Sequence, residues 1–225
     1  MAGTEWRGAL WLARDFCLLD GHAGSAGPHA HYAHQVLLAR ERPVCLLLEG
    51  ESQCADLHFV ESLREHALVE PGQPVLAVYA EPLRLSLATL RATIEGAMPE
   101  LDDLAERLLA APRIKLDPRV ERALTALDAM LAEKISAQVL AREACLSLSQ
   151  LERLFGDQVG LSVRRLVLWR RLRLALRLAL EGQSLTRAAF DAGFADAAHF
   201  SRTMRATFGI RADRNLARLT LRLID

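Results

Sequence analysis

The sequence of 225 residues lacks several features that mark whole classes of protein. No apolar run approaches the roughly 18–20 residues that a membrane-spanning helix needs. Cysteine occurs four times, and no two cysteines form a CxxC pair, which excludes a zinc finger and argues against a disulfide scaffold. The apolar stretch near the N-terminus is interrupted by charged residues such as Arg7 and Asp15, unlike the core of a signal peptide. We therefore expect a cytoplasmic protein.

Charge is distributed unevenly along a chain whose formal net charge is zero. Residues 1–112 hold 8 Arg, no Lys and 16 acidic residues, for a net charge of −8, whereas residues 113–225 hold 18 Arg, 2 Lys and 12 acidic residues, for +8. Such asymmetry indicates that the basic half binds a polyanion, although a chance difference in composition between two domains would produce it too. A hydrophobic fraction of 51% is enough for a buried core.

The spacing of apolar residues along the sequence divides the chain in the same way. Up to about residue 82, short apolar runs alternate with turn signals, which predicts β-strands of a small barrel or sandwich. The expected strands are Val36–Leu38, Val44–Leu48, Leu57–Val60, Ala67–Val69 and Val75–Tyr79. After Pro82 the apolar residues recur every three or four positions, which predicts one helix that ends near Gly96 and a second that ends at Pro112.

Only helices are expected from Asp117 to the end of the chain. Asp117 and Pro118 suit the cap and first position of a helix. Further caps are expected at Ser136, Ser147, Ser162, Ser184 and Asp196. The segment Val163–Leu180 is a long basic amphipathic helix, with six arginines among its leucines. The predicted fold class is therefore α+β and multidomain: an N-terminal β-barrel or sandwich at 1–82, two connecting helices at 83–112, and an all-α domain at 113–225.

The basic half contains an internal repeat. Leu140 to Cys145 resembles Ala188 to Gly193 at an offset of 48, and Leu151 to Phe155 resembles Phe200 to Met204 at an offset of 49. Each copy is predicted to be a helix, a tight turn and a second helix that buries apolar residues and turns an arginine outward. This is the arrangement of a helix-turn-helix unit, whose second helix enters the major groove of DNA.

The repeat resembles the DNA-binding domain of AraC/XylS-type transcriptional regulators over Leu116 to about Leu216. The specific motif comprises Ala189, Gly193-Phe194, Asp196, His199-Phe200-Ser201-Arg202 and Phe208-Gly209. The resemblance implies two helix-turn-helix units, joined by the helix Val163–Leu180, that read two successive major grooves of double-stranded DNA. After the closing glycine the chain departs from the family's usual residues, with Arg211-Ala212 and Asn215-Leu216.

The resemblance assigns DNA-facing positions to two recognition helices, from Leu148 to Gln158 and from Ala197 to Ala206. The first presents Ser149, Gln150, Glu152 and Arg153, and the second presents Ala197, Ala198, Ser201, Arg202 and Arg205. Arginines of the linking helix and of the second unit are expected to contact phosphate rather than bases. These are Arg164, Arg170, Arg171 and Arg187, for which a solvated surface is the alternative. RNA polymerase is a further expected partner if the regulator is an activator.

The acidic half is similar, more diffusely, to a cupin-like sensor domain. His29 and His31 precede an expected strand and fall on the same face, and with His66 they are candidate ligands for a first-row metal. The rival interpretations are a polar pocket for a small-molecule effector and a vestigial site without a ligand. The alternative function is a metal-dependent cupin enzyme with an accessory DNA-binding domain, with Glu49 or Glu65 as a fourth ligand.

The helix after Pro82 carries a leucine stripe that needs a partner surface. Leu83, Leu87, Leu90 and Ile94 form this stripe. Two hypotheses follow, that the stripe forms a homodimer contact or that it packs against the chain's own barrel.

Overall fold

The computed structural model describes residues 5–95, 100–212 and 216–224. The chain forms two compact units, one made of residues 1–114 and 201–225 and the other of residues 115–200. The predicted domain boundaries 1–82, 83–112 and 113–225 stay a prediction. No helix in the described ranges combines the length and apolarity needed to cross a membrane.

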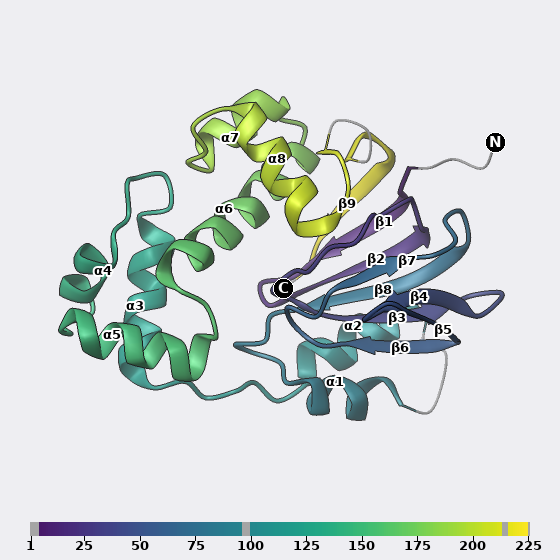
Figure 1. Cartoon of the computed structure of the whole chain (residues 1–225), viewed down its shortest axis with the longest axis horizontal. Coiled ribbons are helices and arrows are strands. Elements are labelled where there is room, and N and C mark those ends of the chain that lie inside the picture. Colours follow the sequence, from purple (N-terminus) through teal and green to yellow (C-terminus); the bar gives the residue numbers. More distant parts are fainter. Residues whose placement is uncertain (1–4, 96–99, 213–215, 225) are drawn as a thin grey trace. The chain divides into compact units, whose positions relative to one another are not determined.

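The first unit contains two β-sheets, as the sequence predicted for its N-terminal part (Figure 1). The larger sheet has the strand order β6-β3-β8-β2-β1-β9, and the smaller has the order β5-β4-β7. The strands are β1 (Arg7–Leu12), β2 (Phe16–His22), β3 (His34–Ala39), β4 (Val44–Leu48), β5 (Glu51–Ala55), β6 (Leu57–Val60), β7 (His66–Leu68), β8 (Pro74–Ala80) and β9 (Leu219–Leu223).

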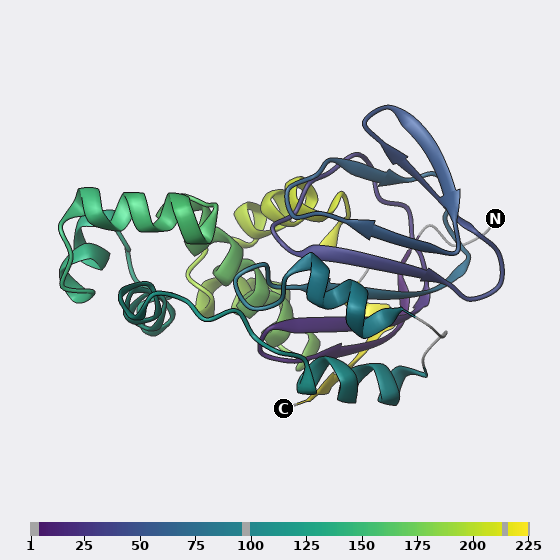
Figure 2. The same ribbon diagram turned by 90° about the horizontal axis from the view of Figure 1, so that it is seen from below.

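Strand β8 shows why the larger sheet has a core on each face. Leu76 and Val78 belong to one hydrophobic cluster, while Val75 and Ala77 belong to another, because successive side chains of a strand point to opposite faces. Residues of β4 belong to the second cluster, and residues of helices α1 (Leu87–Ile94) and α2 (Leu101–Ala110) belong to the first. Figure 2 shows both helices along one face of the sheet. The sheet is therefore covered on both sides, as a continuous apolar strand requires.

The leucine stripe packs inside the chain, which decides between its two hypotheses. Leu90 and Ile94 are buried in the cluster between α1 and the sheet, and Leu83 is 1% exposed. The dimer contact predicted on this stripe is therefore wrong, since its side chains already have a partner surface. Helix α1 begins at Leu87, after the cap Ser86, and its predicted end at Gly96 lies outside the described residues.

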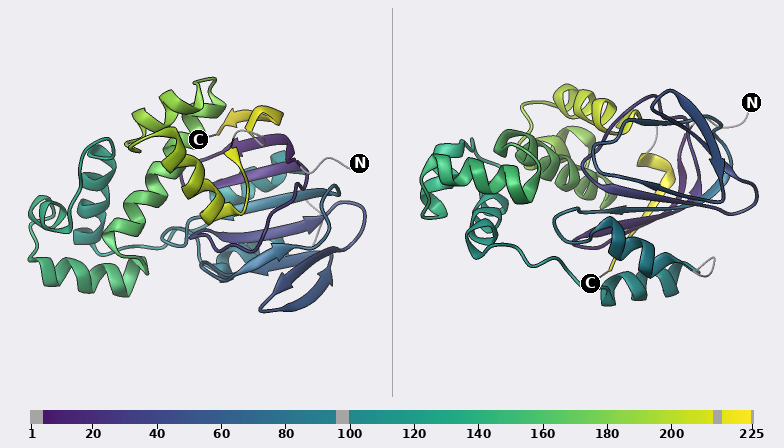
Figure 3. Two further views of the ribbon diagram at one scale, coloured as in Figure 1. Left: turned by 45° about the horizontal axis from the view of Figure 1, so that its top comes forward. Right: turned by 60° about the horizontal axis from the view of Figure 1, so that its bottom comes forward.

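The expectation of helices alone after Asp117 is wrong at the end of the chain. Strand β9 pairs with β1 in parallel, with Leu219 opposite Gly8 and Leu223 opposite Leu12 (Figure 3). The signal was present in the sequence, because leucines alternate there with Thr220 and Arg222. Strands β1, β2 and β5 were also not predicted, whereas the five predicted strands all occur. Cys45 and Cys54 face each other on β4 and β5 and form a disulfide.

The second unit is helical, and its helices begin at the predicted caps. Asp117 accepts from the N–H of Arg119, and Ser136, Ser147, Ser162 and Ser184 each accept from the N–H three residues ahead. The helices are α3 (Pro118–Ala129), α4 (Ala137–Glu143), α5 (Leu148–Leu154), the π-helical turn η1 (Phe155–Val159), α6 (Val163–Leu180) and α7 (Leu185–Asp191). Helix α8 (Ala197–Phe208) starts in this unit and ends in the first, where the 3₁₀ turn η2 (Leu216–Arg218) precedes β9.

Candidate DNA-binding surface and histidine cluster

Equivalent turns of the two repeat copies have the same backbone conformation. Cys145, between α4 and α5, has a φ of 57°, and Gly193, between α7 and α8, has a φ of 84°. Both values lie in the left-handed region, which reverses the chain between two helices within a few residues. The offset of 48 found in the sequence therefore corresponds to a repeated structural turn.

The helices after these turns bury the apolar residues that the repeat predicted. Leu151 and Phe155 are buried in the first copy, and Phe200 and Met204 are buried in the second. Ala141 and Ala189 are buried too, where small side chains let two helices approach closely. The polar residues between these positions are thereby left on the outer face of each second helix.

The first recognition helix, α5 with η1, presents four exposed polar side chains. Ser149, Gln150, Glu152 and Arg153 are all exposed. The side-chain oxygen of Gln150 accepts from the N–H of Ser147, so this amide completes a capping box. Asp157 lies one turn beyond Arg153, but within the described ranges no ion pair joins the two side chains. Glu152 and Arg153 are therefore the residues of this helix whose charged ends are available to DNA.

The second recognition helix is α8. Arg202, Arg205 and Ala198 are exposed, whereas Ala197 and Ser201 are half-buried. The alanine side chains offer no hydrogen-bonding group, so polar contacts from this helix would come from the two arginines and Ser201.

The four arginines expected at phosphate have different surroundings. Arg164 is exposed on α6, and Arg187 is exposed on α7 with its Nε 2.8 Å from Asp191. Arg170 is half-buried, and its Nε lies 3.8 Å from a carboxylate oxygen of Asp128. Arg164 and Arg187 therefore keep the exposure that a phosphate contact needs, while Arg170 faces the interior of the unit.

Arg171 has a structural role, which corrects its assignment to phosphate. Its Nε donates to the carbonyl oxygen of Leu131 at 2.8 Å, and its Nη2 donates to that of Glu133 at 2.5 Å. Partial burial lowers the pKa of its guanidinium. These two carbonyls follow the end of α3, so Arg171 holds the segment after α3 against α6. No local pattern in the sequence signals this role, because the bonding partners are main-chain atoms about 40 residues away.

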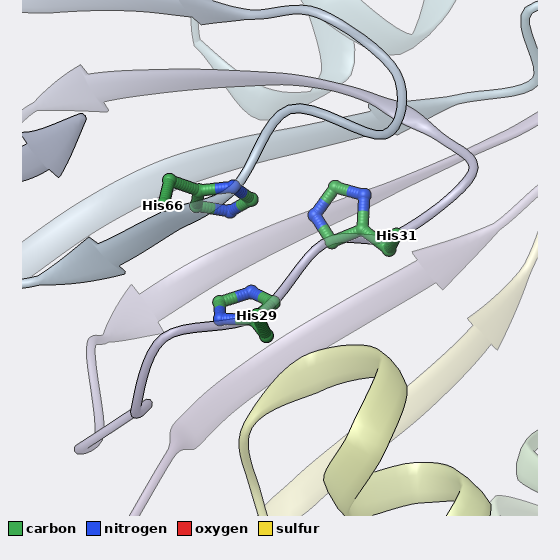
Figure 4. A group of neighbouring side chains, drawn as sticks. All are labelled: His29, His31 and His66. Carbon is green, nitrogen blue, oxygen red and sulfur yellow. The ribbon is translucent and has the colours of Figure 1, made fainter. Parts of the chain in front are cut away.

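Three histidines of the first unit form a cluster. One ring nitrogen from each of His29, His31 and His66 lies within 4.8 Å of the others (Figure 4). Their side chains are almost fully buried. The His-x-His pair and the distant third histidine, proposed from the sequence as candidate ligands, are thus brought together. Neither Glu49 nor Glu65 belongs to this group among the described residues, and Glu49 instead pairs with Arg64, so the fourth ligands suggested for an enzyme are wrong.

Main-chain hydrogen bonds hold the two segments of the cluster together. His29 and His66 form an isolated antiparallel bridge, in which each N–H donates to the other's carbonyl oxygen at 2.9–3.0 Å. The N–H of Leu63 also donates to the carbonyl oxygen of His31, at 2.8 Å. The backbone positions of the three histidines are therefore set by the pairing of the two segments.

Each ring is also oriented by a hydrogen bond from Nδ1. His29 bonds to the carbonyl oxygen of Gly27 at 2.8 Å, His31 to that of Ala33 at 2.9 Å and His66 to that of Arg64 at 2.9 Å. A carbonyl oxygen only accepts, so each Nδ1 carries the hydrogen and each neutral ring keeps its free lone pair on Nε2. Nε2 of His66 is buried and has no hydrogen-bond partner among the described residues.

Burial keeps the three imidazoles neutral. It lowers the pKa of His31 to about 3, with further lowering from the charged forms of His66 and His29, and it lowers the pKa of His66 to about 4. The pKa of His29 is lowered for the same reason. All three side chains are therefore in the form whose lone pairs can bind a metal at neutral pH.

Three further residues lie near His31, and two of them, Gln35 and Tyr79, were not singled out in the sequence. Its Nε2 lies 3.3 Å from Oε1 of Gln35, whose amide nitrogen donates to the hydroxyl of Tyr79 at 2.9 Å. The ring of Phe208, at the end of α8, lies 5.6 Å from the ring of His31. The next residue, Gly209, lies so close to the loop before His29 that a Cβ would be 2.6 Å from the carbonyl oxygen of Gly27.

Comparisons with known proteins agree with the helix-turn-helix geometry. A family model described as a helix-turn-helix domain matches residues 140–216. The probable transcriptional regulator LumQ of Photobacterium leiognathi is 29% identical over 186 residues, which cover 80% of this chain and 71% of LumQ. The HTH-type transcriptional regulator ArgR of Pseudomonas aeruginosa is 29% identical over 104 residues, covering 45% of this chain and 32% of ArgR.

The arrangement of elements is also found in a solved structure. ToxT from Vibrio cholerae has a TM-score of 0.60 with 12% sequence identity, over 92% of this chain and all of that one. At that identity the likeness concerns the fold alone. It confirms a β-rich N-terminal region followed by a helical helix-turn-helix region.

Proposed function

We propose that this chain is a DNA-binding transcriptional regulator with a helix-turn-helix domain of the AraC type, and that it reads two successive major grooves with α5 and α8. The observation that carries the proposal is the repeated unit. Both copies bury the same inner positions, turn through a left-handed residue and expose an arginine at equivalent places, Arg153 and Arg202. Two recognition helices on one side of a duplex would lie about 34 Å apart, one helical turn of DNA.

The two helices are proposed to contribute differently. In α5, Arg153 can bond O6 and N7 of guanine and Glu152 can accept from N4 of cytosine, and a good pair of this kind discriminates by roughly 1–3 kcal/mol. In α8, the alanines can contact thymine methyl groups while Arg202 and Arg205 bond to phosphate or bases. Sequence preference would then rest more on α5 and on the shape of the DNA.

Arg164 and Arg187 are the arginines proposed to anchor phosphate. Both are exposed and both lie outside the recognition helices. Such contacts release counterions from DNA, so they raise affinity for every sequence and make it sensitive to salt.

The domain organisation and partners belong to the same proposal. We infer a sensor region at 1–82, connecting helices at 83–112 and a DNA-binding region at 113–225, in a protein of the cytoplasm, where the DNA is. A homodimer is proposed because two copies could occupy repeated sites on DNA, and contact with RNA polymerase is proposed if the regulator is an activator. The dimer surface would have to lie elsewhere than the buried leucine stripe.

The test is a binding titration of the full chain against a library of random-sequence duplexes at two salt concentrations. We expect enrichment of a preferred sequence and an affinity that falls steeply as salt rises. Replacing both Arg202 and Arg205 by alanine should weaken binding, while Arg107→Ala, an exposed arginine on α2 of the first unit, serves as the matched control. A folded protein that binds no duplex at low salt would contradict the proposal.

A further inference from the structure

The histidine cluster has the organisation of a metal site. Three imidazoles from two chain segments converge within 4.8 Å, and each is oriented by an Nδ1–H that donates to a main-chain carbonyl. Histidines that bind metals nearly always hold their second nitrogen in this way, because the hydrogen bond sets both tautomer and ring direction. Each neutral ring thereby keeps the lone pair of its Nε2 available to a metal.

One of these lone pairs has no hydrogen-bond partner among the described residues, and a second faces another acceptor. Nε2 of His66 is buried without a hydrogen-bond partner in the part of the chain that is described. Nε2 of His31 faces Oε1 of Gln35 at 3.3 Å, and neither atom can donate to the other while Nδ1 of His31 carries the hydrogen. A buried acceptor without a donor is costly, and a cation bound to Nε2 removes that cost.

We propose that His29, His31 and His66 bind one divalent first-row transition metal of the zinc class through their Nε2 atoms. Imidazole ligands suit zinc, cobalt, nickel and copper, whereas magnesium and calcium prefer oxygen ligands. The fourth position would be filled by water, by an anionic ligand or by Oε1 of Gln35.

The spacing requires only a small adjustment. Nitrogens bound tetrahedrally at about 2.0–2.1 Å from zinc lie about 3.3 Å apart. The separation of 3.3 Å between Nε2 of His31 and Oε1 of Gln35 is already of that size. The ring nitrogens, within 4.8 Å of one another, would close by about 1.5 Å at most, which side-chain rotation supplies.

Metal occupancy is further proposed to act on DNA binding, a step that depends on the function proposed above. Phe208, the last residue of α8, and Gly209, which follows it, belong to the same compact unit as the cluster. The ring of Phe208 lies 5.6 Å from that of His31 and is tilted against it, and Gly209, with a φ of 68°, lies against Gly27 and His29. Coordination of a metal would fix the positions of the three rings. It would thereby fix the residues that contact the end of this recognition helix. We expect the metal-bound form to bind DNA more tightly.

Zinc binding to the whole 225-residue chain, first stripped of metal with a chelating resin, tests the site itself. Calorimetric titration should give one Zn²⁺ per chain, and X-ray absorption of the loaded protein should show imidazole nitrogens at about 2.0–2.1 Å. Magnesium should not compete. Binding of much less than one equivalent, or a sulfur-dominated spectrum, would overturn the metal site.

Variants separate this site from any other that binds zinc. His31→Ala and His66→Ala should each weaken zinc binding at least tenfold, and Gln35→Ala should do so by less. His22→Ala is the control, since His22 lies at the end of β2 outside the cluster. Circular dichroism checks that each variant is folded, and the absorption spectrum of the Co²⁺-loaded parent reports the ligand set without any variant. Unchanged binding in both histidine variants would exclude this cluster.

The regulatory step is tested with the same samples on the preferred duplex. Stripping the metal should weaken DNA binding about tenfold, which is within the usual range of coupling between two sites. Adding Zn²⁺ should restore the DNA affinity of the parent and of His22→Ala, but not that of His31→Ala or His66→Ala. Equal DNA affinity with and without metal would overturn the coupling. Stoichiometric zinc in a protein that binds no duplex would leave the metal site standing and contradict the proposed function.

Discussion

The guanidinium of Arg171 occupies the space beside the α-carbon of Gly193. A Cβ built on Gly193 would lie 2.9 Å from Nε of Arg171 and 2.4 Å from the carbonyl oxygen of Leu131. That same oxygen accepts the hydrogen bond from Arg171. The turn of the second helix-turn-helix copy, the linking helix α6 and the segment after α3 therefore meet at one point, where only glycine fits.

Gly193→Ala should destabilise the second unit by more than the cost of placing a side chain at a left-handed position. Gly182, with a φ of 101° and open space within 4 Å of where a Cβ would lie, is the matched control. Gly182→Ala should cost about 1–2 kcal/mol, the usual penalty for a side chain in that region. Gly193→Ala should exceed this by about 2 kcal/mol, because the methyl group displaces the Arg171 bond. Urea unfolding of both variants provides the comparison, and equal losses would contradict the packing described.

Arg171→Ala should change the stability of the protein, whereas Arg164→Ala should change its binding to DNA. Arg171 makes two hydrogen bonds to main-chain carbonyls, so its loss should lower the free energy of unfolding by about 1.5–3 kcal/mol. Arg164 is exposed, so its loss should leave stability unchanged. The slope of log affinity for DNA against log salt concentration should fall in magnitude by roughly one. Denaturation and salt titrations on both variants decide this. A stable Arg171→Ala protein with a reduced salt slope would restore the phosphate assignment.

Cys145→Gly should stabilise the first helix-turn-helix copy. Cys145 has a φ of 57° and an exposed side chain, so little packing is lost when the side chain is removed. Glycine adopts this conformation without the clash of a Cβ, which should raise the melting temperature by the equivalent of about 1 kcal/mol. Cys145→Ala keeps the Cβ and should leave the melting temperature near that of the parent.

Leu90→Ala should unfold the first unit more easily without changing its oligomeric state. Leu90 is fully buried between α1 and the sheet, and removing its side chain should cost about 2–5 kcal/mol. Leu109→Ala, at a position 38% exposed on the neighbouring helix, should cost less than about 0.5 kcal/mol. Calorimetry gives the stabilities and light scattering gives the mass. A shift in mass caused by Leu90→Ala, with stability kept, would restore the dimer contact.

Arg153→Ala should remove sequence preference at one base pair. Arg153 is exposed on the outer face of α5, and its loss should cost about 1–3 kcal/mol on the preferred site with little effect on other sequences. Arg142→Ala, at an exposed arginine on α4, should leave the order of preferred bases unchanged. Titration against single-base changes of the preferred duplex measures both. Intact preferences in Arg153→Ala would mean that another helix reads the sequence.

Much of the helical unit follows from short-range signals. The caps at Ser147 and Ser184, and the burial of Phe200 and Leu151, were all predictable, because capping and helical periodicity depend on neighbours within four residues. The three histidines were identifiable as candidates from residue type, although the sequence left open whether they would meet.

Tertiary structure decided what depends on distant partners. The sequence left the leucine stripe with two candidate surfaces, and burial in the chain's own core chose one. It offered Arg171 as a phosphate ligand, whereas two carbonyls about 40 residues away bind its guanidinium. Strand β9 alternates as a strand should, yet its place in the sheet depends on β1, some 200 residues earlier. Local patterns determine which conformation a segment prefers, but burial and hydrogen-bond pairing are settled only when segments far apart in the chain compete for the same surface.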